Sequence, residues 1–187
     1  MSVPSATNEA GAAPGKYLTF GLADEHYGLE VLRVQEIVGL LPVTRIPRLP
    51  SFVAGVVNLR GRVIPVVDLR LAFGLSTSEM HERTCIIIVN VKRSSGTTTV
   101  MGILVDEVSD VADLSADAIE ETPEFASNVD TSFIKGVGRA EGRVLLLLDI
   151  DKALSSTELD AADHAVASAL AQSPGQESHD SEQSADK

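Results

Sequence analysis

Apolar and polar residues alternate along most of the chain, with the period of two that is typical of strands with one buried face. The alternating runs are short, and Gly, Pro, Asn, Asp or Ser residues separate most of them. They predict strands at residues 17–22, 27–31, 35–41, 55–59, 62–67, 83–92, 97–105, 108–112, 136–140 and 143–148. About five strands in each half are enough to close a small barrel, so the pattern predicts a mainly β fold.

The last predicted element is a helix near the C-terminus. Leu159, Ala162, Val166 and Leu170 recur at the spacing of three or four residues that places side chains on one face of a helix. We therefore expect a C-terminal helix over residues 156–171 that packs against the strands.

Composition changes at both ends of the chain. Residues 1–15 are small and polar, and residues 172–187 are polar and acidic. Segments of this kind bury too little apolar surface to offset the entropy that ordering costs, so we expect two disordered tails. Residues 16–155, which lie between the N-terminal tail and the helix, have the size of one ordinary domain.

An internal repeat relates the two halves of this domain. Residues 52–69 reappear without a gap as residues 133–150, with Phe, Gly, Val, Arg and Asp at matching positions. A weaker match relates residues 28–37 to residues 102–111. Two repeats are too few for a solenoid. The repeat instead predicts two similar lobes that pack together at a seam.

We expect the first lobe to span about residues 16–75 and the second about residues 83–155. The repeated segments should form equivalent hairpins, with Val63 and Val144 on matching faces. A structure that places either segment in a helix would contradict this interpretation.

Each copy of the repeat contains a turn and a cap. Gly61 and Gly142 stand at the turns, where a positive φ matches the twist of the two strands. Asp68 and Asp149 follow the second strand, where a carboxylate that caps a short helical turn is the expected role.

The two copies differ at the tip of the hairpin. Arg60 in the first copy aligns with Glu141 in the second. Because the planar guanidinium suits carboxylates, Arg60 is a candidate recognition residue. A solvated turn residue is the alternative.

Charge and composition disfavour several classes of function. The net charge is −12 and the pI is near 4.6, which disfavours binding to nucleic acid or anionic lipid. The sequence contains no apolar run of membrane-spanning length and no secretory leader, so we expect a cytoplasmic protein without direct membrane insertion.

Catalytic chemistry is equally unsupported. The four histidines lack the spacing of a zinc site, and Cys85 lies in an apolar run where a buried, inert thiol is expected. No set of residues combines a nucleophile, a base and an oxyanion site. We therefore expect a protein that is not an enzyme and that holds no metal or cofactor.

Residues 58–70, which read Asn-Leu-Arg-Gly-Arg-Val-Ile-Pro-Val-Val-Asp-Leu-Arg, closely resemble the CheW family of bacterial chemotaxis coupling proteins. The similarity spans about residues 16–170 and includes residues 27–37, 43–46 and 123–125. It implies two five-stranded SH3-like barrels around a shared core. One departure is the hairpin at residues 92–99, which is longer than is typical of the family.

The resemblance also implies an adaptor function. A CheW-type adaptor links the cytoplasmic tips of transmembrane chemoreceptors to the histidine kinase CheA, whose regulatory domain resembles it. The implied location is a receptor array at the inner face of the membrane, with contacts to CheA, to receptors and between copies of the adaptor.

Family roles carry over to two groups of residues in this sequence. The receptor-facing set consists of Val34, Glu36, Gly55, Arg60 and Gly61. The kinase-contact set consists of Val43, Arg45, Ile46, Glu124 and Phe125. Because Phe125 follows Pro123 and Glu124 outside the strand pattern, we expect it to be partly exposed and to anchor the kinase; a core role is the alternative.

Two other functions stay open. A CheW-type scaffold could serve a different sensory pathway, such as surface motility or development, and the partner kinase would decide. A small-barrel ligand or nucleic-acid binder would need a basic or aromatic face, which this sequence lacks.

Overall fold

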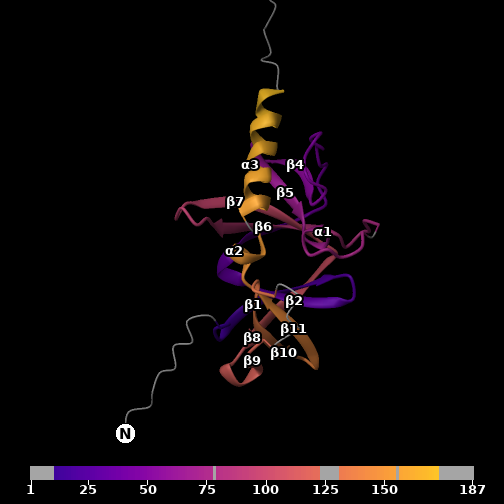
Figure 1. Cartoon of the computed structure of the whole chain (residues 1–187). Coiled ribbons are helices and arrows are strands. Elements are labelled where there is room, and N and C mark those ends of the chain that lie inside the picture. The colour runs from indigo at the N-terminus through magenta and orange to yellow at the C-terminus, as the bar shows by residue number, and fades with distance from the viewer. Residues whose placement is uncertain (1–10, 78, 123–130, 155, 173–187) are drawn as a thin grey trace, which may run out of the picture.

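The computed structural model describes residues 11–77, 79–122, 131–154 and 156–172. Figure 1 shows two β-sheets at opposite ends of the molecule and a long helix, α3, that stands along one of them. The strands are β1 (Gly15–Leu22), β2 (Glu25–Glu30), β3 (Val34–Gly39), β4 (Val53–Leu59), β5 (Arg62–Asp68), β6 (Cys85–Lys92), β7 (Thr98–Val105), β8 (Glu107–Leu114), β9 (Ile119–Glu120), β10 (Ile134–Ala140) and β11 (Arg143–Leu148). The helices are α1 (Leu69–Ala72), α2 (Ile150–Ala153) and α3 (Ser156–Ala171), with 3-10 turns η1 (Val31–Arg33) and η2 (Ala116–Ala118). The predicted strands are all present, and β9 is an addition.

The two sheets do not follow the two halves of the chain. Sheet one has the order β3-β6-β7-β5-β4, and sheet two has the order β8-β1-β2-β11-β10-β9. The hairpin β1–β2 from the first half therefore joins strands of the second half, and β6–β7 joins strands of the first. This differs from our expectation of contiguous lobes at about residues 16–75 and 83–155. The physical reason is that η1 carries the chain straight from β2 into β3 of the other sheet, without a reversing turn.

The repeated segments nevertheless form equivalent hairpins. Val56 pairs with Pro65 between β4 and β5, and Val137 pairs with Leu146 between β10 and β11, so the two registers are the same. Both hairpins shift register one step after their first pair. Each hairpin also packs its second strand in parallel against a strand of the exchanged hairpin: β5 against β7, and β11 against β2.

The turns and caps of the two hairpins also match. Arg60 and Gly61 have φ of 53° and 83°, and Glu141 and Gly142 have φ of 51° and 75°. Two successive positive φ values give the hairpin turn whose twist suits the flanking strands. After each hairpin an aspartate caps the short helix: the carboxylate of Asp68 accepts from the amide of Arg70 at 2.9 Å, and α2 begins in the same way.

Strand β6 of sheet one buries both of its faces over residues 85–89. Ile86 and Ile88 of β6 point into the barrel of sheet one, whereas Ile87 and Val89 enter the main core between the sheets. This explains why residues 85–89 are continuously apolar and do not alternate. The main core also contains α2 and the start of α3, so it joins the two sheets.

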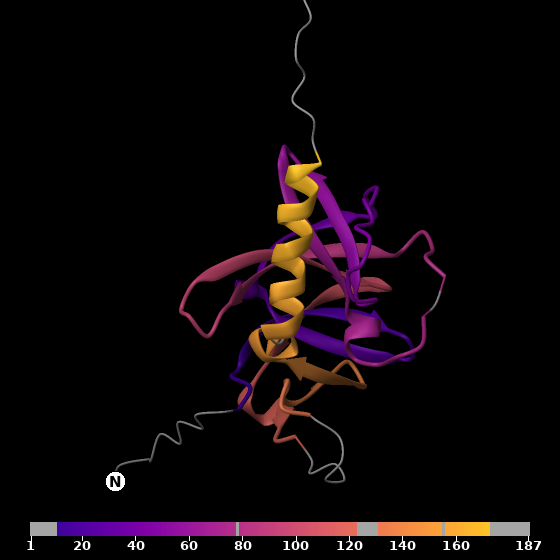
Figure 2. The same ribbon diagram turned by 45° about the horizontal axis from the view of Figure 1, so that its top comes forward.

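Helix α3 makes the two hairpins unequal. It lies along β4 and β5 in both views (Figures 1 and 2), and its Ala165 packs against Val53 and Val56 with Val63 at the edge. Val63 and Val144 hold matching positions in their hairpins, opposite Asn58 and Arg139, as the repeat predicts. Val144 is 57% exposed, however, because α3 covers only the first hairpin.

The long β6–β7 hairpin helps to hold α3 in place. Arg93 lies in its loop and donates to the carboxylate of Asp163 and, through Nε, to Thr99 Oγ1 at 2.8 Å. A second carboxylate, Asp160, lies 3.6 Å from Nη1 of the same guanidinium. The loop between β6 and β7 thus contacts the C-terminal helix through Arg93.

Candidate protein-interaction site

Of the expected receptor-facing set, Glu36, Arg60 and Gly61 lie together at the turn between β4 and β5, whereas Gly55 lies near the start of β4 and Val34 at the start of β3. Both Nη atoms of Arg60 donate to the two Oε atoms of Glu36 on β3, each at 2.8 Å. The amide of Gly61 donates to Oδ1 of Asn58 at 2.8 Å, which closes the turn. A two-pronged pair of this kind fixes the direction of a guanidinium. The tip of the hairpin is therefore tied to the edge strand of the same sheet.

This pairing refines the role of Arg60. Its side chain is 74% exposed, whereas that of Glu36 is 28% exposed. The hydrogen bonds from Arg60 to Glu36 raise the pKa of the guanidinium above its ordinary value, so the charge is permanent at any working pH. The sequence predicts a candidate recognition residue or a solvated turn residue, and the structure adds that Glu36 already accepts hydrogen bonds from two of the guanidinium donors. The remaining donors stay open to a partner.

Gly55 has a structural role: it allows two backbone segments to cross closely. Its φ is 141°, and a Cβ at this position would lie 2.2 Å from the carbonyl oxygen of Thr44. Thr44 and Val56 exchange two backbone hydrogen bonds, at 2.8 and 2.9 Å. Only glycine permits so close a crossing of the two backbones. Gly55 thereby holds the segment that carries the kinase-contact residues against β4.

The described part of the kinase-contact set lies on this crossing segment. Val43 packs on the barrel of sheet one and Ile46 packs near α3, while Arg45 is exposed. All three line a hollow of about 480 Å³, with Met80 also on its wall. Glu124 and Phe125 lie outside the described residues. The expected exposure of Phe125 is therefore untested.

Two exposed apolar residues escaped the sequence prediction. Leu32 on η1 is 92% exposed, and Ile37 on β3 is 44% exposed. Val34, between them, is half-buried against the main core. The signal for Leu32 in the sequence is the interruption after residue 31, where the strand predicted at residues 27–31 ends.

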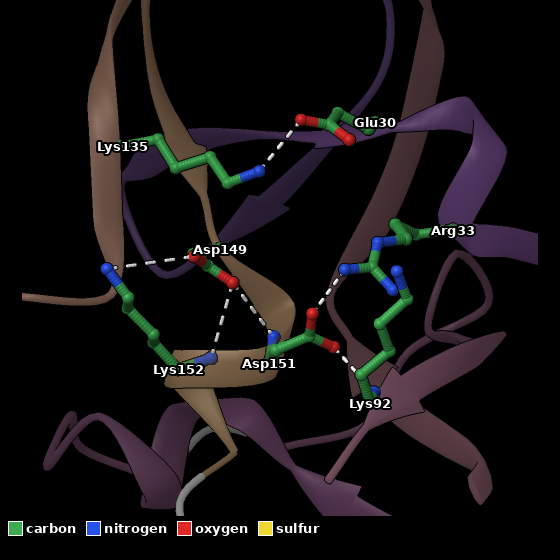
Figure 3. Close-up of polar contacts among 7 residues, drawn as sticks. All are labelled: Glu30, Arg33, Lys92, Lys135, Asp149, Asp151 and Lys152. Atoms are coloured by element: carbon green, nitrogen blue, oxygen red, sulfur yellow. Dashed lines mark hydrogen bonds and ion pairs between the residues drawn. The ribbon is translucent and has the colours of Figure 1, made fainter. Parts of the chain in front are cut away.

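A polar cluster fixes the start of β3 (Figure 3). Arg33 donates to the carboxylate of Asp151 on α2, and the other oxygen of Asp151 accepts from the backbone amide of Lys92 at 2.6 Å. Nearby, Lys135 on β10 donates to Glu30 at 2.8 Å. These contacts join η1, α2, β6 and β10. They position the strand that carries Val34 and Glu36 relative to both sheets.

A second cluster of the same design lies at the other crossover between the sheets. Nη1 of Arg70 on α1 lies 3.1 Å from Oδ1 of Asp106, between β7 and β8. The other oxygen of Asp106 accepts from the backbone amide of Ala23 at 2.8 Å. The repeat aligns Arg70 with Asp151, so the two clusters carry opposite polarity. Arg70 is only 2% exposed, whereas the side chains of Arg33 and Asp151 are 19% and 22% exposed.

The described residues show neither an exposed cysteine nor a cluster of metal-binding side chains. Burial raises the pKa of the Cys85 thiol, and the side chain is 8% exposed, which disfavours the reactive thiolate. Within the described residues no group of three or more His, Cys, Asp or Glu side chains could hold a metal ion. None of the helices in the described part is long and apolar enough to cross a membrane.

Comparisons with known proteins agree with this picture of a binding protein. The model of the CheW-like domain matches residues 16–158. The chemotaxis protein CheW of Klebsiella aerogenes is 42% identical over 156 residues, which cover 83% of this chain and 91% of that protein. The CheW of Rhizobium meliloti is 38% identical over 145 residues, or 78% of this chain and 90% of that protein.

A solved structure gives the same answer. The scaffolding protein TtCheW from Thermoanaerobacter tengcongensis superposes with a TM-score of 0.67 at 32% identity, covering 78% of this chain and 96% of that chain. This match confirms the expected fold of two SH3-like barrels with a C-terminal helix. On the sequence match over residues 16–158 and the shared fold, the chain belongs to the CheW family.

Proposed function

We propose that this protein is a non-enzymatic adaptor that couples transmembrane chemoreceptors to the histidine kinase CheA in chemotaxis arrays. Relatives in the family carry the name chemotaxis protein CheW, and one solved relative is described as a scaffolding protein. The proposal places the protein in the cytoplasm, recruited to arrays at the inner face of the membrane.

The observation that carries the proposal is the surface around the Glu36–Arg60 pair. It presents an exposed guanidinium that two hydrogen bonds to Glu36 hold at a hairpin tip. A fixed, exposed charge suits a protein partner because it sets the orientation of binding. We assign this surface to the receptor tip.

The kinase occupies a different surface in this proposal. The hollow lined by Val43, Arg45 and Ile46 has a mixed apolar and polar lining, and the exposed cation of Arg45 suits a partner surface that carries acidic side chains. By the family resemblance, Glu124 and Phe125 complete the kinase contacts. Separate surfaces would let one adaptor hold receptor and kinase together.

The test is reconstitution. The purified protein is mixed with the cytoplasmic fragment of a chemoreceptor and with CheA, and kinase autophosphorylation is measured. We expect kinase activation only when all three components are present. The control replaces this protein with its Gly55→Val variant, in which the crossing of Thr44 over β4 is blocked. If CheA activity is the same with and without the protein, and neither partner binds it, the proposal is wrong.

A further inference from the structure

The pseudo-symmetry gives the Glu36–Arg60 pair a counterpart in sheet two. Strand β8 pairs with β1 in the same way as β3 pairs with β6. Val108 pairs with Phe20 in sheet two, and Val34 pairs with Val89 at the equivalent place in sheet one. Both strand pairs then shift register at the next residue. The same alignment relates Glu36 to Asp110 on β8.

The hairpin tips extend the correspondence. Glu141 occupies the tip of β10–β11 with φ of 51°, as Arg60 occupies the tip of β4–β5 with φ of 53°. Sheet two thus has Asp110 and Glu141 where sheet one has Glu36 and Arg60. Two carboxylates repel each other, so Asp110 and Glu141 cannot form an ion pair like the one that joins Glu36 to Arg60 in sheet one.

A hollow remains at this place in sheet two. It has a volume of about 330 Å³, and Asp110 and Glu141 both line it. Thr19 Oγ1 donates to Oδ1 of Asp110, which holds that carboxylate in place. Among the described residues, Glu141 has no ion-pair or hydrogen-bond partner.

Two cations, Arg139 and Arg143, also line the hollow, and among the described residues neither forms an ion pair with Asp110 or Glu141. Asp113 is paired with Lys16, and Arg139 is paired with Glu120. His26 also lines the hollow. Arg143 is exposed, and its counterpart in sheet one, Arg62, likewise forms no ion pair among the described residues.

We propose that this hollow binds an arginine or lysine side chain of a protein partner, at the place equivalent to that of the Arg60 guanidinium in sheet one. The same molecule shows how the site is filled, because the equivalent carboxylate of Glu36 holds a guanidinium through two hydrogen bonds. Val111, which is 51% exposed, supplies an apolar wall for the methylene groups of such a side chain. That the partner is a protein rests on the proposed adaptor function.

The first test needs no partner. Carboxyl carbon signals of the full chain are followed by NMR during titration with argininamide, and citrulline amide serves as the neutral control. We expect saturable shifts at Glu141 and Asp110 with argininamide alone. Glu141→Arg should abolish them, because this variant carries the residue of sheet one and can close the hollow itself. An unshifted parent overturns the proposal.

The second test uses the two partners of the proposed function. Dissociation constants for the receptor fragment and for the CheA regulatory domain are measured with Asp110→Asn, Glu141→Gln and Glu141→Arg. Asp117→Asn, at an exposed position on η2 outside the hollow, is the control. We expect Glu141→Arg to raise the dissociation constant of one of the two partners about fivefold, and Asp110→Asn and Glu141→Gln to raise it by less. Asp117→Asn should leave it unchanged.

The outcomes separate the two proposals. If every variant binds both partners like the parent, the hollow is not a partner site, although the adaptor function stands. If the parent binds neither partner, the adaptor function fails, and the hollow is no adaptor site even if argininamide binds there.

Discussion

At the scale of single residues, variants of the Arg60–Glu36 ion pair can separate the proposed recognition role of Arg60 from a role in positioning the hairpin. We expect Arg60→Glu to weaken receptor binding by about tenfold or more, and more than Arg60→Ala, because it places two carboxylates together and removes the exposed cation. The melting temperature should change little, since the side chain is exposed.

The control for this prediction is the double variant Glu36→Arg/Arg60→Glu, which restores the pair with reversed polarity. If Arg60 contacts the receptor, the double variant stays defective in receptor binding by titration. Full recovery would show that only the pairing matters and that the guanidinium positions the hairpin without touching a partner.

The two polar clusters at the crossovers predict unequal effects on stability. Arg70→Met leaves the carboxylates of Asp68 and Asp106 without their buried cation, so it should lower the free energy of unfolding by about 3–5 kcal/mol. Arg33→Met breaks the equivalent but partly solvated pair and should cost only about 1 kcal/mol. Urea unfolding of both variants measures the difference. Equal losses would contradict the argument from burial.

The sequence could indicate the residues of the site but not their contacts. Resemblance placed Glu36 and Arg60 in one set, yet their hydrogen bonds join residues 24 positions apart and depend on how β3 docks on its sheet. The turn glycine at Gly61 and the cap at Asp68 were predictable, because each follows from local backbone geometry. Exposure of Leu32 was not, since it depends on where η1 leaves the sheet.

At the scale of elements, the sequence predicts the hairpins but not how strands of different hairpins pair into sheets. The hairpins β4–β5 and β10–β11 were predictable because a turn and two adjacent runs define them. The pairing of β2 with β11 was not, because a strand carries no local record of a distant partner. We assumed that neighbours in sequence share a sheet, which is the usual case. Here η1 redirects the chain, and the assumption fails.

The close packing of helix α3 predicts that the stability of the protein depends strongly on side-chain size at Ala165. Ala165 is fully buried against β4 and β5, so Ala165→Leu should force α3 away from the hairpin and destabilise the protein by about 1–3 kcal/mol. Ala167→Leu makes the same change two residues along, at an exposed position, and should be nearly neutral. Thermal melting compares the two variants. A large loss in Ala167→Leu, or none in Ala165→Leu, would show that α3 packs differently.

At the scale of the whole molecule, the exchange of hairpins makes the two sheets interdependent. Sheet one needs β6–β7 from the second half, and sheet two needs β1–β2 from the first half. The main core also draws residues from both sheets and from α2 and α3. A small unit of this kind is expected to unfold in one cooperative transition. Neither half of the chain contains a complete sheet.

This interdependence predicts the behaviour of a chain cut between its halves. A protease site inserted between Ser76 and Thr77 lies in the connection between α1 and β6, outside the described strands and helices. After cleavage the two fragments should stay together through size-exclusion chromatography, because each completes a sheet of the other. They should then unfold together in urea, in one transition. A cut at the same point in a protein with contiguous lobes would instead release two independently folded fragments, and that result here would contradict the exchanged topology.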